Sequence, residues 1–138
     1  MSRRYVLDSY ALLAFLQDEP GSQEVEDLIT AEDTEIFVSV VNLGEVFYIL
    51  WREAGEHAAL DFETRVFETT KVKVMGASWE RVKAAARLKA RGGLSFADCF
   101  GASLAQELGA VLVTGDPEFA RLEDEGSLRV LWLPRDSS

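Results

Sequence analysis

Short apolar runs alternate with helix-like segments along the whole chain, and this alternation limits the fold more than any other feature of the sequence. The runs are short enough and β-prone enough for buried strands, and they cover residues 4–7, 35–38, 71–75, 110–113 and 128–133. Between them, apolar residues recur at helical spacing, so about seven helices are expected. Because parallel strands need long crossovers, the pattern predicts an α/β fold with a mainly parallel five-stranded sheet and helices on both faces.

The length of 138 residues fits one domain, covering residues 1–138. The single cysteine, Cys99, excludes an internal disulfide framework and suits a reducing cytoplasm. The opening segment, MSRRYVLDSY, is typical of neither a signal peptide nor a membrane span. We therefore expect a cytoplasmic protein that does not act at a membrane.

The net charge of −10 limits the classes of function. General RNA-binding modules usually carry a basic surface, and this composition argues against one. It argues less against an enzyme whose acidic side chains gather in one cation-binding pocket.

Acidic residues stand where such a pocket is expected, beyond the carboxyl ends of the strands. Asp8 and Asp116 follow the first and fourth predicted strands, Glu45 lies in the helix after the second strand, and Asp98 begins the helix before the fourth. Each has a structural alternative as well. Asp8, Asp116 and the Ser95-x-x-Asp98 segment are also suited to helix caps, and Glu45 to a solvated helical face.

Convergence of the four carboxylates favours the functional interpretation. At roughly 5 Å and an effective dielectric near 20, each ionised pair costs about 3 kcal/mol, so the site takes up protons or a cation. Hard oxygen ligands favour Mg²⁺ or Mn²⁺ over zinc. The chemistry expected from such a site is metal-assisted hydrolysis of a phosphodiester.

Four segments together resemble the PIN-domain nucleases, and within them the VapC-like toxins of toxin–antitoxin pairs. These are VLDSYALLAFL (6–16), VSVVNLGEVFYIL (38–50), LSFADCFGASLAQELGA (94–110) and VLVTGDPEF (111–119). The resemblance implies a three-layer fold with strand order 3-2-1-4-5. It also matches Asp8, Glu45, Asp98 and Asp116 to the family's acidic residues, and it places Thr114 and Ser9 beside them. Tyr10 departs from the pattern, since a small hydroxyl residue is common there.

The resemblance further implies an endoribonuclease that leaves a 5′-phosphate and a 3′-hydroxyl, forms a homodimer, and is masked by the C-terminal segment of a cognate antitoxin. We expect Asp8 and Asp98 to be the main metal ligands, with Glu45 and Asp116 completing the shell or orienting water. For the RNA backbone the best candidates are Lys83, Arg87 and Arg91, at helical spacing. A solvated helical face explains these three equally well.

Two other functions compete with a toxin. A housekeeping PIN nuclease for RNA maturation is indistinguishable at this level. A non-catalytic phosphoacceptor of flavodoxin-like topology also gathers aspartates at strand ends, but it needs a late lysine where this chain has TGDPEF. The remaining reactive residues have structural interpretations: His57 as an exposed helix residue, Cys99 as a small buried residue, and Phe47, Tyr48 and Trp51 in core or dimer packing.

Overall fold

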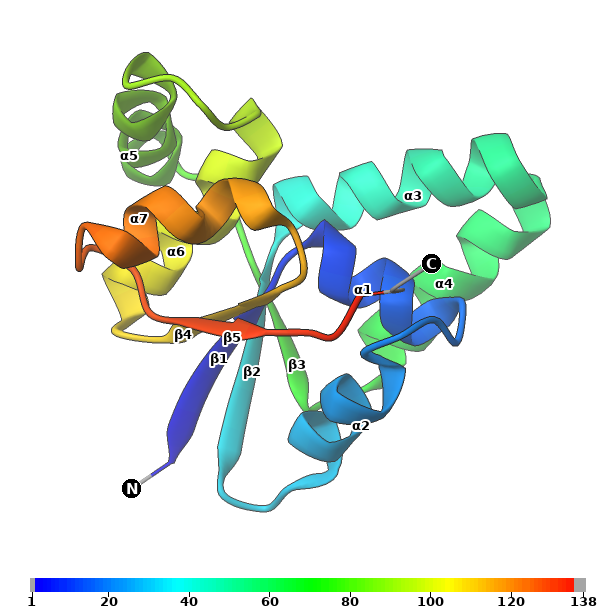
Figure 1. Cartoon of the computed structure of the whole chain (residues 1–138). Helices are drawn as coiled ribbons and strands as arrows, with labels where there is room; N and C mark the ends of the chain where they lie inside the picture. The colour runs from blue at the N-terminus through cyan, green and yellow to red at the C-terminus, as the bar shows by residue number, and fades with distance from the viewer. Residues whose placement is uncertain (1, 136–138) are drawn as a thin grey trace.

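In the computed structural model, which describes residues 2–135, five parallel strands form one sheet (Figure 1). The strands are β1 (Arg3–Leu7), β2 (Thr34–Ser39), β3 (Val72–Met75), β4 (Val111–Thr114) and β5 (Val130–Trp132). Their order across the sheet is β3-β2-β1-β4-β5, as the resemblance implies. Each predicted strand is present, with ends shifted by at most two residues. A flavodoxin-like sheet has the order 2-1-3-4-5, so the topology of the phosphoacceptor alternative is wrong.

In the part of the chain that the structure describes, seven α-helices and one 3₁₀ turn connect the strands. They are α1 (Ser9–Leu16), α2 (Ser22–Thr30), α3 (Val40–Ala54), α4 (Glu56–Glu68), α5 (Trp79–Ala90), α6 (Phe96–Leu108), the turn η1 (Pro117–Phe119) and α7 (Ala120–Asp124). Polar side chains start most of these segments by accepting a hydrogen bond from a free backbone N–H group. The capping residues are Asp8, Ser39, Ser78, Ser95 and Asp116.

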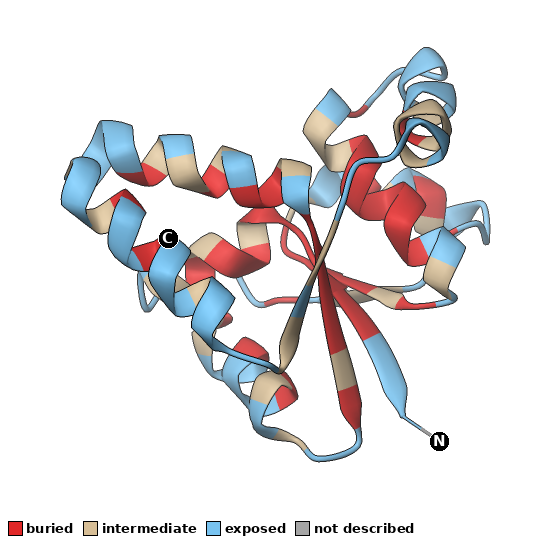
Figure 2. Cartoon of the chain, turned by 180° about the vertical axis from the view of Figure 1, so that it is seen from behind, coloured by how far each residue is buried: buried red, intermediate tan, exposed pale blue. Residues whose placement is uncertain are grey.

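The helices form two layers on the two faces of the sheet (Figure 1). Residues of α1 to α4 pack with Leu7, Ile36 and Val38 into one buried cluster, and residues of α5 to α7 pack with Val6 and Leu112 into the other. Figure 2 shows this pattern, with buried residues along the central strands and α6, while α4 is largely exposed. Alternate strand residues face opposite cores because successive side chains point to opposite sides of a strand.

The pairing of β1 with β4 places the carboxyl ends of these two strands side by side. On one side of this point the strands follow in the order β1, β2, β3, and on the other side in the order β4, β5. Leu7 is paired with Val113, so Asp8 lies beside Thr114. Helix α6 packs closely over this point because residue 101 is glycine. A Cβ atom there would lie 3.2 Å from Asn42 Oδ1 and 3.7 Å from Asp8 Cβ. A larger residue at position 101 would therefore push α6 away from Asn42 and Asp8.

Within residues 2–135, no helix is both long enough and apolar enough to cross a membrane.

Candidate active site

Asp8 is the most buried of the predicted site carboxylates, with 1% of its surface exposed. It caps α1, and its Oδ1 accepts a hydrogen bond of 2.9 Å from the backbone N–H of Ala11. Its Oδ2 accepts a hydrogen bond from the Thr114 hydroxyl. Burial raises the pKa of Asp8 to about 7, helped by the charges of Asp98 and Asp116 and opposed by these two hydrogen bonds. Asp8 is therefore both the N-cap of α1 and a member of the predicted acidic site.

Thr114 joins the two strand ends. Its side chain is fully buried, and its Oγ1 also accepts a hydrogen bond of 3.1 Å from the backbone N–H of Asp116. Asp116 in turn caps η1, because its Oδ1 accepts from the backbone N–H of Glu118 at 3.0 Å. This chain of contacts sets the shape of the turn after β4 and explains why Thr114 lies beside the acidic residues.

Asp98 comes from the opposite side, in the first turn of α6, where Ser95 caps the helix by accepting from the Asp98 N–H at 3.1 Å. Single carboxylate oxygens of Asp98, Asp116 and Glu118 all lie within 4.8 Å of one another. Burial raises the pKa of Asp98 to about 6, and the negative charges of Asp116, Glu45 and Glu118 act in the same direction. This tight cluster contains two of the four predicted carboxylates and adds Glu118.

Glu45 is half-buried on α3 and lies at the edge of this cluster, near enough for its charge to act on Asp98. Asp8 also lies outside the group of three but within electrostatic reach of Asp98 and Asp116. The four predicted carboxylates thus share one region at the carboxyl ends of the strands. They come from the start of α1, from α3, from α6 and from the turn after β4.

Two further residues belong to this region and were not predicted from the sequence. Glu118 stands two residues after Asp116 and belongs to the same turn, a spacing that could have identified it. Asn42 is fully buried, and its Nδ2 donates to Ser9 Oγ at 3.3 Å and to the Ala97 carbonyl at 3.0 Å. Ser9 in turn donates to the Asn42 carbonyl at 3.3 Å. Asn42 therefore connects the helices that carry Asp8, Glu45 and Asp98.

The carboxylates of this region share one electrostatic property: within residues 2–135, none of them forms an ion pair with a lysine, arginine or histidine. Buried carboxylates without a basic partner either take up protons or bind a cation. The ligand atoms are all oxygens, which fits Mg²⁺ or Mn²⁺. The residues present thus fit the divalent cation that the sequence analysis predicts.

Basic residues predicted to contact RNA lie at and beyond α5. Lys83 is half-buried and pairs with Glu80 at 3.4 Å, whereas Arg87 is exposed. Arg91, which caps the end of α5, pairs with Glu125 at 2.6 Å. These positions leave both interpretations of the helix open.

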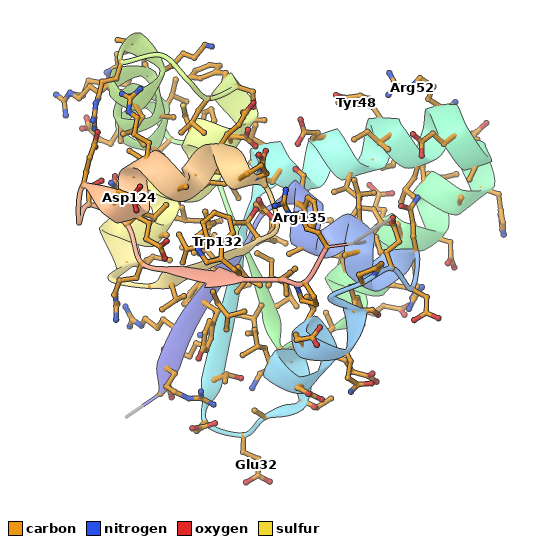
Figure 3. The ribbon with its side chains drawn as sticks, viewed as in Figure 1. Glu32, Tyr48, Arg52, Asp124, Trp132 and Arg135 are labelled. Carbon is orange, nitrogen blue, oxygen red and sulfur yellow. The ribbon has the colours of Figure 1, made fainter. Side chains whose placement is uncertain are left out.

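His57, Cys99 and Phe47 take the structural positions that we expected, whereas Tyr48 and Trp51 lie at the surface, so core packing is wrong for these two and dimer packing stays a prediction. His57 is exposed on α4, and Cys99 is fully buried, which raises the pKa of its thiol. Phe47 packs against the core and against Trp51, with ring centroids 5.8 Å apart. Tyr48 and Trp51 are exposed, and Figure 3 shows Tyr48 and Arg52 on the side of α3 that points away from the sheet.

The profile of the PIN domain family matches residues 5–125, and the chain therefore belongs to that family. A comparison with curated protein sequences finds no match. Among solved structures, the chain is similar to VapBC2 from Rickettsia felis bound to a promoter DNA fragment, with 18% identity, a TM-score of 0.72, and coverage of 93% of this chain and 97% of that one.

Two further structures have the same fold. Mycobacterium tuberculosis VapC20, described as a toxin that cleaves the sarcin-ricin loop, is 18% identical with a TM-score of 0.72 and coverage of 85% of this chain and 93% of that one. VapBC-1 from nontypeable Haemophilus influenzae is 20% identical with a TM-score of 0.68 and coverage of 94% and 97%. At these identities the likeness establishes the fold.

Proposed function

We propose that this chain is a metal-dependent endoribonuclease whose active site comprises Asp8, Glu45, Asp98 and Asp116, together with Glu118. One observation carries this proposal: carboxylates from four separate elements gather at the switch point of the sheet without a basic partner. A fold stabilised only by helix caps has no need for this arrangement, because each mutual repulsion lowers its stability. Membership of the PIN domain family, whose members are nucleases, supports the same function.

Asp98 and Asp116 would hold the divalent cation, because their oxygens lie within 4.8 Å of each other. Asp8, which we expected from the sequence to be a main ligand, would lie behind them, with Glu45 and Glu118 at the rim. A bound Mg²⁺ or Mn²⁺ supplies positive charge to the scissile phosphate and lowers the pKa of an attacking water. The chain contributes rigidity: Asp8 is fixed by Ala11 and Thr114, and Asp116 by Thr114 and Glu118. Rim carboxylates can orient the water and accept its proton. Attack on phosphorus, with the 3′ oxygen leaving, yields a 5′-phosphate and a 3′-hydroxyl.

A toxin masked by a cognate antitoxin is the cellular role that we propose, acting as a homodimer in the cytoplasm. The VapBC folds of the structural neighbours support this role. The exposed Tyr48 and Trp51 on α3 and Phe67 at the end of α4 offer apolar surface for a second copy or an antitoxin. A housekeeping role in RNA maturation predicts no growth arrest when the chain is expressed alone, whereas a toxin arrests growth until its antitoxin is supplied.

The enzymatic proposal is tested with purified protein and labelled structured RNA, comparing Mg²⁺ or Mn²⁺ with EDTA. Asp98→Asn keeps the shape of the side chain and removes its charge. Its matched control is Asp124→Asn, on the exposed end of α7 (Figure 3). We expect cleavage that requires the metal, falls by at least about 100-fold in Asp98→Asn, and is unchanged in Asp124→Asn.

Normal cleavage by Asp98→Asn, or cleavage in EDTA, would refute the assignment of the site. If wild-type protein cleaves none of a panel of tRNA and ribosomal RNA fragments, calorimetry of Mn²⁺ binding decides whether the metal site exists. Binding that depends on Asp98 preserves the metal site and points to a narrower substrate. Absence of binding would refute the metal site and leave Asp8 and Asp116 as helix caps only.

A further inference from the structure

A small cavity adjoins the acidic cluster on the side of α5 and α7. Its volume is about 60 Å³, and its lining includes Arg91, the Gly92–Gly93 turn, Glu118 and Arg121. At about 30 Å³ for each water in the liquid, it has room for about two waters. Because Glu118 belongs to both places, the cavity begins where the acidic cluster ends.

Two arginines from separate segments converge on this cavity. Arg91 follows α5, whereas Arg121 lies on α7, thirty positions later in the sequence. The Arg121 guanidinium lies against the turn, since a Cβ atom at Gly93 would be only 3.3 Å from Arg121 Nη1. Gly93 also has a φ of +90°, a conformation that other residues rarely adopt. The turn is therefore suited to bringing an arginine against the backbone.

One carboxylate holds both arginines in place. Glu125 Oε2 lies 2.6 Å from Arg91 Nη2, and Glu125 Oε1 lies 3.3 Å from Arg121 Nε. Two guanidinium groups share the single negative charge of Glu125, so these three side chains carry one net positive charge, which faces the carboxylate of Glu118 across the cavity. All three side chains are partly exposed, at 44%, 52% and 38% for Arg91, Arg121 and Glu125, so an anion in solution can reach them. Arginine is the residue best suited to phosphate oxygens, because its donors form a planar fork.

We propose that Arg91 and Arg121 form a binding site for a backbone phosphate of the RNA next to the scissile one. This inference rests on the proposed function, and it deepens it by saying how an acidic chain holds a polyanion. The two arginines supply positive charge next to the active site. Only Arg91 was predicted from the sequence to contact RNA. The fold places Arg121 of α7 beside Arg91.

In the absence of RNA, the Glu125 carboxylate occupies the position of the phosphate between the two arginines. In the free protein it orders the two arginines, and it competes with the RNA for them. If Glu125 only bridges α5 and α7, its removal would loosen the two arginines and would not increase the affinity for RNA. If it competes with the RNA, its removal would increase that affinity. The sign of the effect of Glu125→Gln therefore distinguishes the two roles.

The test measures binding of a short fluorescein-labelled single-stranded RNA by anisotropy at several salt concentrations. All variants are made in the Asp98→Asn background with EDTA, so that the RNA stays intact whether or not the proposed cleavage occurs. The variants are Arg91→Gln/Arg121→Gln and Glu125→Gln. The control is Arg65→Gln/Arg129→Gln, which removes the same charge at exposed positions away from the cavity.

We expect the Arg91→Gln/Arg121→Gln variant to bind the RNA about ten-fold more weakly at low salt. Its plot of log K against log salt should be less steep by about 0.7, since the proposed site contacts one phosphate of a single strand. Glu125→Gln should bind severalfold more tightly, and the control should follow the unmodified background. Thermal unfolding of each variant verifies that it is folded.

Equal affinity and equal salt dependence of the Arg91→Gln/Arg121→Gln variant and the control would overturn the proposal. So would weaker binding by Glu125→Gln, or no RNA binding by the background protein at low salt. None of these results affects metal-dependent cleavage by the wild type, which is measured separately. The failure of this inference is therefore distinguishable from the failure of the proposed function.

Discussion

The two ends of the sheet carry the same kinds of charged residue in opposite electrostatic states. At the amino end of the strands, Arg3 pairs with Asp33 at 3.0 Å, and Glu35 accepts from both Arg4 and Lys73. These arginine and lysine partners lower the pKa of Asp33 and Glu35. At the carboxyl end, the pKa values of Asp8 and Asp98 are raised.

The difference separates the charges with a structural role in this protein from those that we propose to be functional. Exposed, paired charges at the amino end interact weakly with their surroundings, because water already solvates them. Unpaired carboxylates at the carboxyl end are held together by the fold although they repel one another. This repulsion lowers the stability of the fold, and it is expected at a site where a bound ligand offsets the negative charge.

The largest expected effect comes from neutralising one aspartate at each end of the sheet. Asp8→Asn should lower the rate of RNA cleavage by at least about 100-fold, because the charge behind the proposed metal is lost. Asparagine still caps α1, so the fold should survive. Asp33→Asn should leave the rate within about two-fold of wild type. The measurement is single-turnover cleavage with saturating Mg²⁺. If Asp8→Asn and Asp33→Asn lowered the cleavage rate equally, the two ends of the sheet would not differ in function.

The two ends should also respond to pH in opposite directions. The raised pKa of Asp8 means that the folded state binds its proton more tightly than the unfolded state, so stability falls as pH rises from about 4 to about 7. For Asp8 alone the loss is about 4 kcal/mol at most, at 1.36 kcal/mol for each pKa unit. Asp33 and Glu35 have lowered pKa values, so their contribution is present above about pH 4.5 and is lost on further acidification.

Urea unfolding of metal-free protein between pH 4 and pH 8 measures this balance. We expect Asp8→Asn to be less sensitive than wild type to the rise in pH. We also expect Mn²⁺ to stabilise the wild type most at the alkaline end, because it binds the ionised carboxylates. A wild-type stability that increases steadily up to pH 8 without metal would contradict the raised pKa of Asp8.

The smallest expected effect concerns the turn that carries Asp116. A Cβ atom at Gly115 would lie only 2.3 Å from the ring of Tyr10, so Gly115→Ala has to displace the ring or the turn. We expect a loss of about 1–3 kcal/mol in stability, as is usual for overpacking, together with weaker Mn²⁺ binding. Gly44→Ala is the matched control, because nothing lies within 4 Å of a Cβ atom there. If Tyr10→Ala does not rescue Gly115→Ala, the contact is not the cause.

Much of the fold could be predicted from the sequence, because local patterns determine it. The run from residue 110 to 113 is apolar with two valines, and Ser95 caps a helix where the sequence indicated one. Element ends were less predictable. The fifth strand is only Val130–Trp132, because pairing with β4 ends there although the apolar run continues to Leu133. The strand order came from the family resemblance.

Local sequence was enough to predict which elements form and which carboxylates follow them, because these depend on residues near one another in the chain. It could not predict which charges meet. Glu118 joined Asp98 through a turn and a helix from different parts of the chain, and Arg121 met Arg91 through a shared carboxylate. Tertiary packing alone made Asp8 buried while Asp33 is exposed and paired. Burial and pairing depend on contacts between distant segments, and these contacts shift the pKa of a side chain away from the value that its type alone predicts.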